Sequence, residues 1–164
     1  MRSSVQQIFM SSKSTNRQVM MFSATMSEDV KEVCKAFTKN PFELFIDSDA
    51  KLTLHGLKQY FVKLEENQKI QKLIELLDAL EFNQVIIFVS QTKYANALQE
   101  IIKGEGFPSV ASHSDMKQEQ RIKIYNEFKE AKYRIMISTD MYGRGIDVEK
   151  INIVVNFNMP DKAD

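Results

Sequence analysis

From residue 57 onward, short apolar runs alternate with segments whose apolar residues recur at helical spacing. The apolar runs predict strands at residues 57–64, 85–89, 109–112, 134–138 and 151–157. The helical spacing predicts helices over residues 70–80, 94–102 and 117–129. Strands that are apolar on both faces need cover on both, so this alternation predicts an α/β fold with a mainly parallel sheet and helices on both faces.

The first 56 residues carry the same alternation in a less regular form. Residues 18–22 and 42–46 are predicted strands. Between them, one helical face is marked by Val30, Val33, Cys34 and Phe37. Ser27 is the predicted N-cap of this helix, and Pro41 is expected to end it. Residues 47–56 are polar and irregular, which predicts a linker.

Composition restricts the kind of protein. The 164 residues correspond to about one domain, and 22 basic residues balance 22 acidic ones. A zero net charge excludes a generally basic nucleic-acid coat and an acidic tail, so any site for a polyanion must be local. Cys34 is the only cysteine, so the sequence allows no internal disulfide and suits a reducing compartment. No apolar run approaches the ~18 residues of a membrane span, and the N-terminus does not look like a signal peptide.

The richest candidate site is the loop that follows the predicted strand 134–138. Parallel sheets bind ligands where loops leave the carboxyl ends of strands, so the loops after Phe22, Val89, Ser112 and Ser138 deserve inspection. Residues 139–147 combine a hydroxyl, two carboxylates, a guanidinium and two glycines. Glycine lets backbone amides approach a phosphate, and arginine grips one bidentately. An ordinary turn, the alternative, needs only one or two of these residues.

Three further segments are weaker candidates by themselves. Residues 23–25 are small and polar before a helix, and residues 90–92 include Ser90, which could simply cap the next helix. Residues 118–121 occupy a first helical turn, where free amides and Arg121 could hold a phosphate or form a solvated face. His113 has no second His or Cys at metal-ligand spacing, so a structural role is expected and no metal site is predicted. Residues 112–150 hold eight basic and seven acidic residues, so no basic patch is present there.

Taken in order, these segments resemble the motifs of the DEAD-box RNA helicases. Ser23-Ala24-Thr25 matches Ser-Ala-Thr, and residues 85–89 resemble the family's apolar strand with its Phe88. Gln118 and Arg121 match Gln-x-x-Arg. Thr139-Asp140-x-x-x-Arg144-Gly145-x-Asp147 matches Thr-Asp-x-x-x-Arg-Gly-x-Asp, which fixes five positions. Residues 18–25, 51–57 and 80–84 are most similar to the eukaryotic splicing and mRNA-export subgroup, whose signature reads Asp-Glu-Cys-Asp.

The resemblance implies a two-lobed hydrolase that binds ATP and single-stranded RNA between RecA-like lobes. By position, residues 1–46 would be the last helix-strand-helix-strand piece of the first lobe. Residues 47–56 would be the interlobe linker, and residues 57–164 an incomplete second lobe that stops before the final arginine motif. The parent protein would use ATP with Mg²⁺ and work with splicing and export factors in the nucleus. We expect a monomer without a membrane partner.

The resemblance also implies roles for individual residues. Ser23 and Thr25 would couple the two lobes. The residues expected to touch or support RNA are Ser90, Gln91, Gln118, Arg121, Thr139 and Arg144. Gly145 and Asp147 would face the nucleotide, with Asp147 at the ribose. Phe88 would pack under the missing arginine motif. The family usually has glycine where Asp115 stands, so we expect Asp115 to cap the following helix. Gln91 stands where Ser or Thr is common, which weakens a phosphate contact.

Motifs that the sequence lacks define what this chain can do. There is no Gly-x-x-x-x-Gly-Lys-[Ser/Thr] phosphate loop and no Asp-Glu-x-Asp. We therefore expect a fragment of an ATP-dependent RNA helicase that is inactive by itself. The alternative is a stand-alone, non-catalytic module that binds RNA or a partner protein. We also expect residues 57–157 to form the ordered sheet, with residues 1–45 packed loosely against it or detached.

Overall fold

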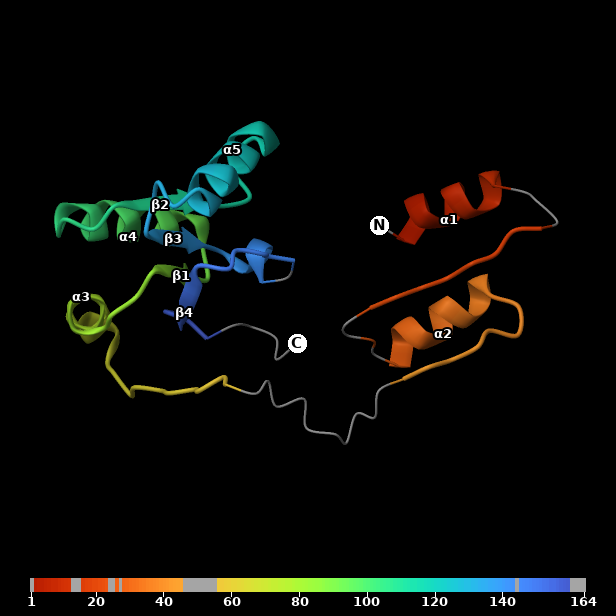
Figure 1. Cartoon of the computed structure of the whole chain (residues 1–164), viewed down its shortest axis with the longest axis horizontal. Helices are drawn as coiled ribbons and strands as arrows, with labels where there is room; N and C mark the ends of the chain where they lie inside the picture. Colours follow the sequence, from red (N-terminus) through yellow and green to blue (C-terminus); the bar gives the residue numbers. More distant parts are fainter. Residues whose placement is uncertain are drawn as a thin grey trace. The chain divides into compact units, whose positions relative to one another are not determined.

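A computed structural model describes residues 2–12, 16–23, 26, 28–45, 56–143 and 145–159. The chain forms two units, Met1–Gln59 and Tyr60–Ala163 (Figure 1). Within the described residues, no helix has the length and apolar character needed to cross a bilayer.

The first unit contains two helices, α1 (Arg2–Ser11) and α2 (Glu28–Phe37). They meet through Phe9 and Phe37, whose rings pack edge to face with centroids 4.8 Å apart. Glu28 and Asp29 give the first turn of α2 a favourable charge against the helix dipole. The predicted cap Ser27 lies outside the described residues. The helix ends at Phe37, before Pro41, and the hydroxyl of Thr38 donates to the carbonyl of Cys34 at 3.1 Å.

Two strand predictions for this unit are wrong. Residues 18–22 and 42–45 run without strand hydrogen bonds, and Ile46 lies outside the described residues. Met20, Phe22 and Phe42 are 67%, 88% and 92% exposed. A strand is stabilised by pairing with a neighbour, and the described part of this unit offers none.

The second unit is built on a four-stranded parallel sheet in the order β2-β3-β1-β4. The strands are β1 (Gln84–Phe88), β2 (Ser109–Ser112), β3 (Ile135–Ser138) and β4 (Ile151–Asn156). The helices are α3 (Lys69–Ala79), α4 (Thr92–Gly104) and α5 (Gln118–Lys129). Short 3-10 turns occur at η1 (Glu66–Gln68) and η2 (Asp140–Tyr142). These elements confirm the predicted parallel α/β sheet.

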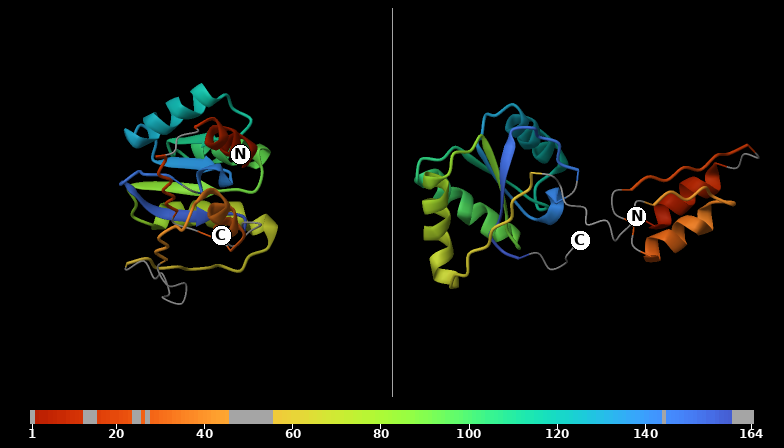
Figure 2. Two further views of the ribbon diagram at one scale, coloured as in Figure 1. Left: turned by 90° about the vertical axis from the view of Figure 1, so that its right-hand side faces the viewer. Right: turned by 60° about the horizontal axis from the view of Figure 1, so that its bottom comes forward.

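Two apolar layers hold helices against opposite faces of this sheet. On one face, Val85 and Ile87 of β1 pack with residues of α3 and α4, including Leu77 and Leu98. On the other face, Ile86 packs with Phe128 of α5 and Met136 of β3. Figure 2 shows α3 and α4 on one side of the sheet and α5 on the other. The prediction of helices on both faces is therefore confirmed.

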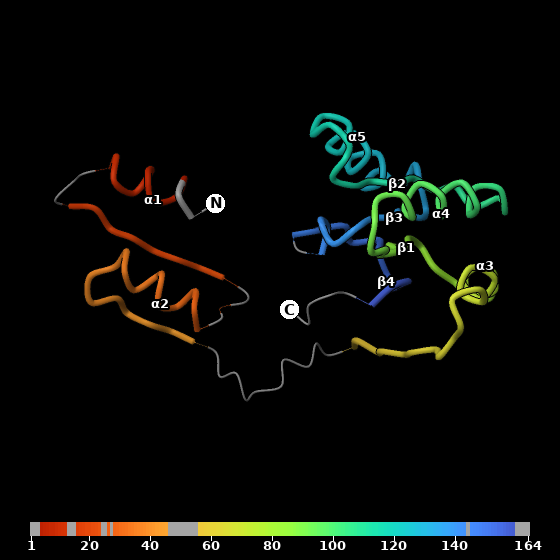
Figure 3. Tube along the Cα trace, turned by 180° about the vertical axis from the view of Figure 1, so that it is seen from behind, coloured from red at the N-terminus to blue at the C-terminus, as the bar shows by residue number. Residues whose placement is uncertain are grey.

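Of the first and last strands predicted for this unit, at residues 57–64 and 151–157, only the last forms. Residues 57–64 form no strand, because this stretch runs extended toward α3 without a paired neighbour (Figure 3). Tyr60 and Phe61 are 85% and 93% exposed. β4 lies at an edge of the sheet, and its Val154 is 58% exposed.

Candidate RNA-backbone site

Three of the four loops singled out by the sequence meet at one edge of the sheet. Phe88, Ser112 and Ser138 are in register at the ends of β1, β2 and β3. The amide of Val89 donates to the carbonyl of Ser138 at 2.8 Å, which holds the loops after β1 and β3 side by side. The fourth loop, after Phe22, belongs to the first unit.

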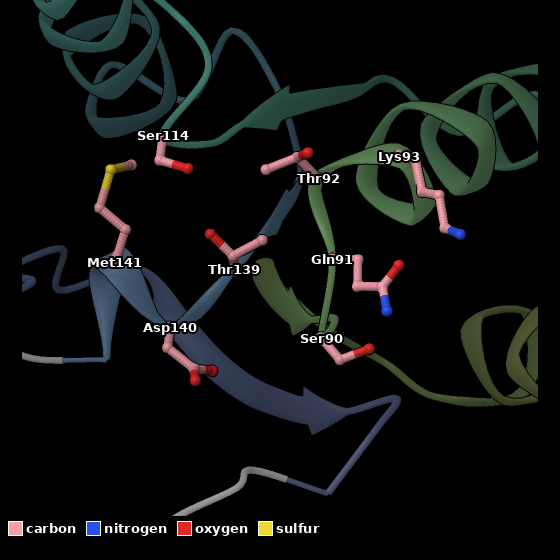
Figure 4. A pocket seen from close by; sticks show the side chains of 8 residues that line it. All are labelled: Ser90, Gln91, Thr92, Lys93, Ser114, Thr139, Asp140 and Met141. Carbon is pink, nitrogen blue, oxygen red and sulfur yellow. The ribbon is translucent and has the colours of Figure 1, made fainter.

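The three loops border an open hollow of about 610 Å³. It is lined by Ser90, Gln91, Thr92, Lys93, Ser114, Thr139, Asp140 and Met141. Figure 4 shows the side chains of Thr92, Ser114 and Thr139 around it, each from a different loop. The lining therefore offers several hydroxyl groups from separate parts of the sequence.

Helix α4 begins at this hollow without a side-chain cap. Its N-cap is Gln91, in extended conformation, and the side chain of Gln91 makes no capping hydrogen bond within the described residues. Ser90 is therefore not the cap; its amide donates to Asn158 Oδ1 at 3.2 Å. The first amides of α4 and the positive end of its dipole thus face the hollow, an arrangement that favours an anion.

Asp115 links two walls of the hollow. Thr92 Oγ1 donates to Asp115 Oδ2 at 2.6 Å, and Ser114 Oγ donates to Asp115 Oδ1 at 3.4 Å. The expectation that Asp115 caps the following helix is wrong, because the N-cap of α5 is Lys117. Asp115 lies in the loop after β2, and Thr92 is the first residue of α4. The hydrogen bond between them therefore connects the start of α4 to that loop.

Charge is sparse among the described residues of the lining. Lys93 and Asp140 are their charged members. In Figure 4 the side chain of Lys93 extends away from Thr139. A ligand here would meet mainly hydroxyls and amides, as expected from the lack of a basic patch in the sequence.

The motif loop 139–147 has local backbone reasons for its glycines. Thr139 is the N-cap residue of η2, and the amide of Gly143 donates to the carbonyl of Asp140 at 2.9 Å. A Cβ at Gly143 would lie 3.1 Å from that carbonyl oxygen, and Gly145 has φ of +78°. Both glycines therefore serve the turn itself, so the turn interpretation accounts for part of this loop.

Arg121 lies beside the hollow and does not line it. Its Nη1 donates to the sulfur of Met141, which does line it. Arg121 Nε is buried and has no hydrogen-bond partner within the described residues. Gln118 is exposed in the first turn of α5 and is not in the lining. Of these two predicted RNA-binding residues, Arg121 therefore contacts the lining only through Met141, and Gln118 lies outside the lining.

The remaining predicted residues are distributed as follows. Ser90, Gln91 and Thr139 come together at the hollow. Gly145 and Asp147 lie exposed at the far end of the motif loop. Ser23 belongs to the first unit, and Thr25 and Arg144 lie outside the described residues.

Sequence reasoning assigned no ligand role to five lining residues. They are Thr92, Lys93, Ser114, Asp140 and Met141. All lie within five residues of the carboxyl end of a strand, and this position in the sequence was the signal that could have identified them. His113 is buried, with Nε2 3.0 Å from Asn96 Oδ1, so its structural role is confirmed. Among the described residues no group of three or more His, Cys, Asp or Glu could hold a metal ion.

Residues 68–164 match the helicase conserved C-terminal domain, so this chain belongs to that family. Among its relatives is the ATP-dependent RNA helicase SUB2 of Coccidioides immitis, 55% identical over all 164 residues. The SUB2 helicase of Lodderomyces elongisporus is 54% identical over the same length. The chain spans 37% and 38% of these two relatives.

Solved structures agree with this assignment. S. cerevisiae Dbp5 bound to RNA and ADP BeF3 matches 97% of this chain and 40% of its own, with 28% identity and a TM-score of 0.83. A DEAD box protein from Methanococcus jannaschii matches 96% of this chain and 42% of its own, with 28% identity and a TM-score of 0.60. The predicted DEAD-box resemblance and RecA-like fold are therefore confirmed.

Proposed function

We propose that this chain provides the second-lobe functions of an ATP-dependent RNA helicase. The hollow at the ends of β1, β2 and β3 binds phosphates of single-stranded RNA, and Asp147 binds the nucleotide ribose. The observation that carries this proposal is the uncapped start of α4 beside the hydroxyl of Thr139, since the hydroxyls of Thr92 and Ser114 already donate to Asp115. Hydroxyls and helix amides bind phosphate oxygens and carry no information about base identity.

At the far end of the motif loop, the carboxylate of Asp147 is suited to bind the hydroxyls of a ribose. Asp147 is exposed, and its carboxylate has no hydrogen-bond partner within the described residues. An ionised carboxylate accepts hydrogen bonds, as a ribose hydroxyl requires. When bound, ATP would supply the phosphoryl group whose hydrolysis drives the helicase cycle. The phosphate loop and Mg²⁺ ligands are absent from this sequence, so a first lobe would have to contribute them.

The biological setting is proposed from the subgroup resemblance. We infer a role in mRNA splicing and export, with partners among the factors of those processes and a nuclear location. SUB2 helicases are among the relatives, and a Dbp5 structure is bound to Gle1 and IP6. Ser23 and Thr25 would couple the lobes in the same parent protein.

A chimera tests the proposed function. The matching 164-residue segment of the Coccidioides immitis SUB2 helicase is replaced by this chain, and RNA-stimulated ATP hydrolysis is measured. We expect the chimera to hydrolyse ATP in response to RNA. We expect the isolated 164-residue chain to show none. A chimera without RNA-stimulated hydrolysis, together with tight RNA binding by the isolated chain, would favour the stand-alone RNA-binding module.

A matched pair of lysines tests the location of the RNA site. Lys93 lies at the first turn of α4 in the lining, and Lys103 lies in its last turn. Lys93→Ala should weaken binding of oligo-U and oligo-A equally, whereas Lys103→Ala should leave both unchanged. Equal losses for the two lysines, or a loss for one base sequence only, would contradict phosphate binding at this hollow.

A further inference from the structure

The hydroxyl of Tyr125 holds both backbone groups of Asp147. Tyr125 is on α5, and its hydroxyl lies 3.3 Å from the carbonyl oxygen of Asp147 and 3.3 Å from its amide nitrogen. It donates to the carbonyl and accepts from the amide. Within the described residues, these are the backbone hydrogen bonds that Asp147 makes.

A second tyrosine joins the start of the same loop to α5. Tyr142 stacks on Tyr125, with ring centroids 6.1 Å apart and an interplanar angle of 15°. The Tyr142 hydroxyl lies 3.1 Å from Ser112 Oγ and 3.5 Å from the carbonyl of Arg121. Helix α5 therefore contacts the motif loop at both ends, through two adjacent aromatic rings.

Between these contacts, Ile146 packs against the core layer that contains Phe128 and Met136, while its described neighbours Gly145 and Asp147 are exposed. Gly145 is exposed, has φ of +78°, and no atom would lie within 4 Å of a Cβ placed on it. Asp147 is exposed, and the next buried anchor is Val148. The direction of the Asp147 side chain is set by its backbone, so the bonds from Tyr125 bear directly on where its carboxylate points.

We propose that Tyr125 is a positioning residue for nucleotide binding: its hydroxyl fixes the backbone of Asp147 so that the carboxylate meets the ribose hydroxyls. This inference rests on the proposed ribose contact of Asp147. Tyr125 is not in the lining of the hollow, so its effect on the nucleotide is separable from RNA binding.

The test measures discrimination between ATP and 2′,3′-dideoxy-ATP, which lacks both ribose hydroxyls. Equilibrium binding of each to the chimera is measured by calorimetry without RNA, so that RNA-stimulated hydrolysis does not consume the ATP. Tyr125→Phe should weaken ATP binding about 3- to 10-fold, the effect of losing one or two neutral hydrogen bonds. Binding of the dideoxy nucleotide should be unchanged, so the discrimination ratio falls by the same factor. A variant that is merely less stable would weaken both nucleotides alike.

Two comparisons complete the experiment. Tyr133→Phe removes a hydroxyl from the same core layer that has no hydrogen-bond partner within the described residues, and it should change neither nucleotide. In an Asp147→Ala background, Tyr125→Phe should have no further effect on ATP, because the group that it positions is gone.

The outcomes separate the two claims. Additive losses from Tyr125→Phe and Asp147→Ala, or equal losses for both nucleotides, would overturn the positioning role. A parent chimera that binds both nucleotides equally would overturn the ribose contact and the positioning role together. Loss of RNA-stimulated hydrolysis in the parent chimera, with discrimination intact, would count against the proposed helicase function alone.

Discussion

Replacing the Asp115 carboxylate with an amide should strengthen RNA binding. Asp115 brings a negative charge to the rim of the hollow, at a position where DEAD-box proteins usually have glycine. Asp115→Asn retains a side-chain oxygen that can accept from Thr92, so the link at 2.6 Å can persist while the charge is removed. The perturbation is therefore mainly electrostatic.

The expected size follows from the geometry. A phosphate oxygen that accepts from the backbone amide of Thr92, one of the first free amides of α4, would place its phosphorus about 6 Å from the Asp115 carboxylate, given ordinary hydrogen-bond lengths. Two unit charges at about 6 Å in water repel by ~0.7 kcal/mol. Screening at about 0.1 M salt lowers this to roughly half, because the Debye length is then ~10 Å. Removing the charge should thus tighten RNA binding about twofold at that salt concentration.

The assay is fluorescence anisotropy of a labelled single-stranded RNA with the chimera at two salt concentrations. Asp115→Asn should bind more tightly, and its advantage should shrink as salt rises. Asp78→Asn, the same change at an exposed position on α3, is the matched control and should change nothing. Unchanged or weaker RNA binding by Asp115→Asn would refute the reasoning and place the phosphate path elsewhere.

Three further predictions concern stability, RNA binding and local order. Gln84 is 1% exposed, and its Nε2 donates to two backbone carbonyls at 2.7 and 2.8 Å. Gln84→Met should therefore lower the free energy of unfolding by about 1–3 kcal/mol in a urea titration, because the carbonyl of Tyr133 loses its donor while that of Phe128 keeps the amide of Ala131 at 2.9 Å. A loss under 1 kcal/mol would show that the carbonyls find other partners. Arg121→Ala in the chimera should weaken RNA binding and reduce the slope of affinity against salt, as one cation is lost. An unchanged slope would mean that Arg121 acts only by supporting Met141. Hydrogen exchange should be fast across residues 18–22 and slow across residues 84–88, since only the latter form ladder bonds. Equal protection would contradict the absence of pairing in the first unit.

Local patterns in the sequence were sufficient where an element's own residues decide its structure. The run 85–89 is continuously apolar because it is covered on both faces, and β1 forms there with its neighbours β3 and β4. The helical spacing over residues 94–102 likewise corresponds to α4. The motif loop was recognisable because its residue types are fixed by turn geometry and chemistry within nine positions.

Pairing and packing partners, in contrast, were decided by the tertiary structure. Residues 18–22 and 57–64 have strand-like composition, yet neither pairs, because a strand needs a neighbour that its own sequence does not specify. Asp115 has the residue type of a helix cap, but its carboxylate instead accepts a hydrogen bond from the hydroxyl of Thr92, 23 positions earlier. The bond from Tyr125 to Asp147 spans 22 positions in the same way. Such contacts depend on where separate elements meet in space, and a one-dimensional pattern of residue types does not contain that information.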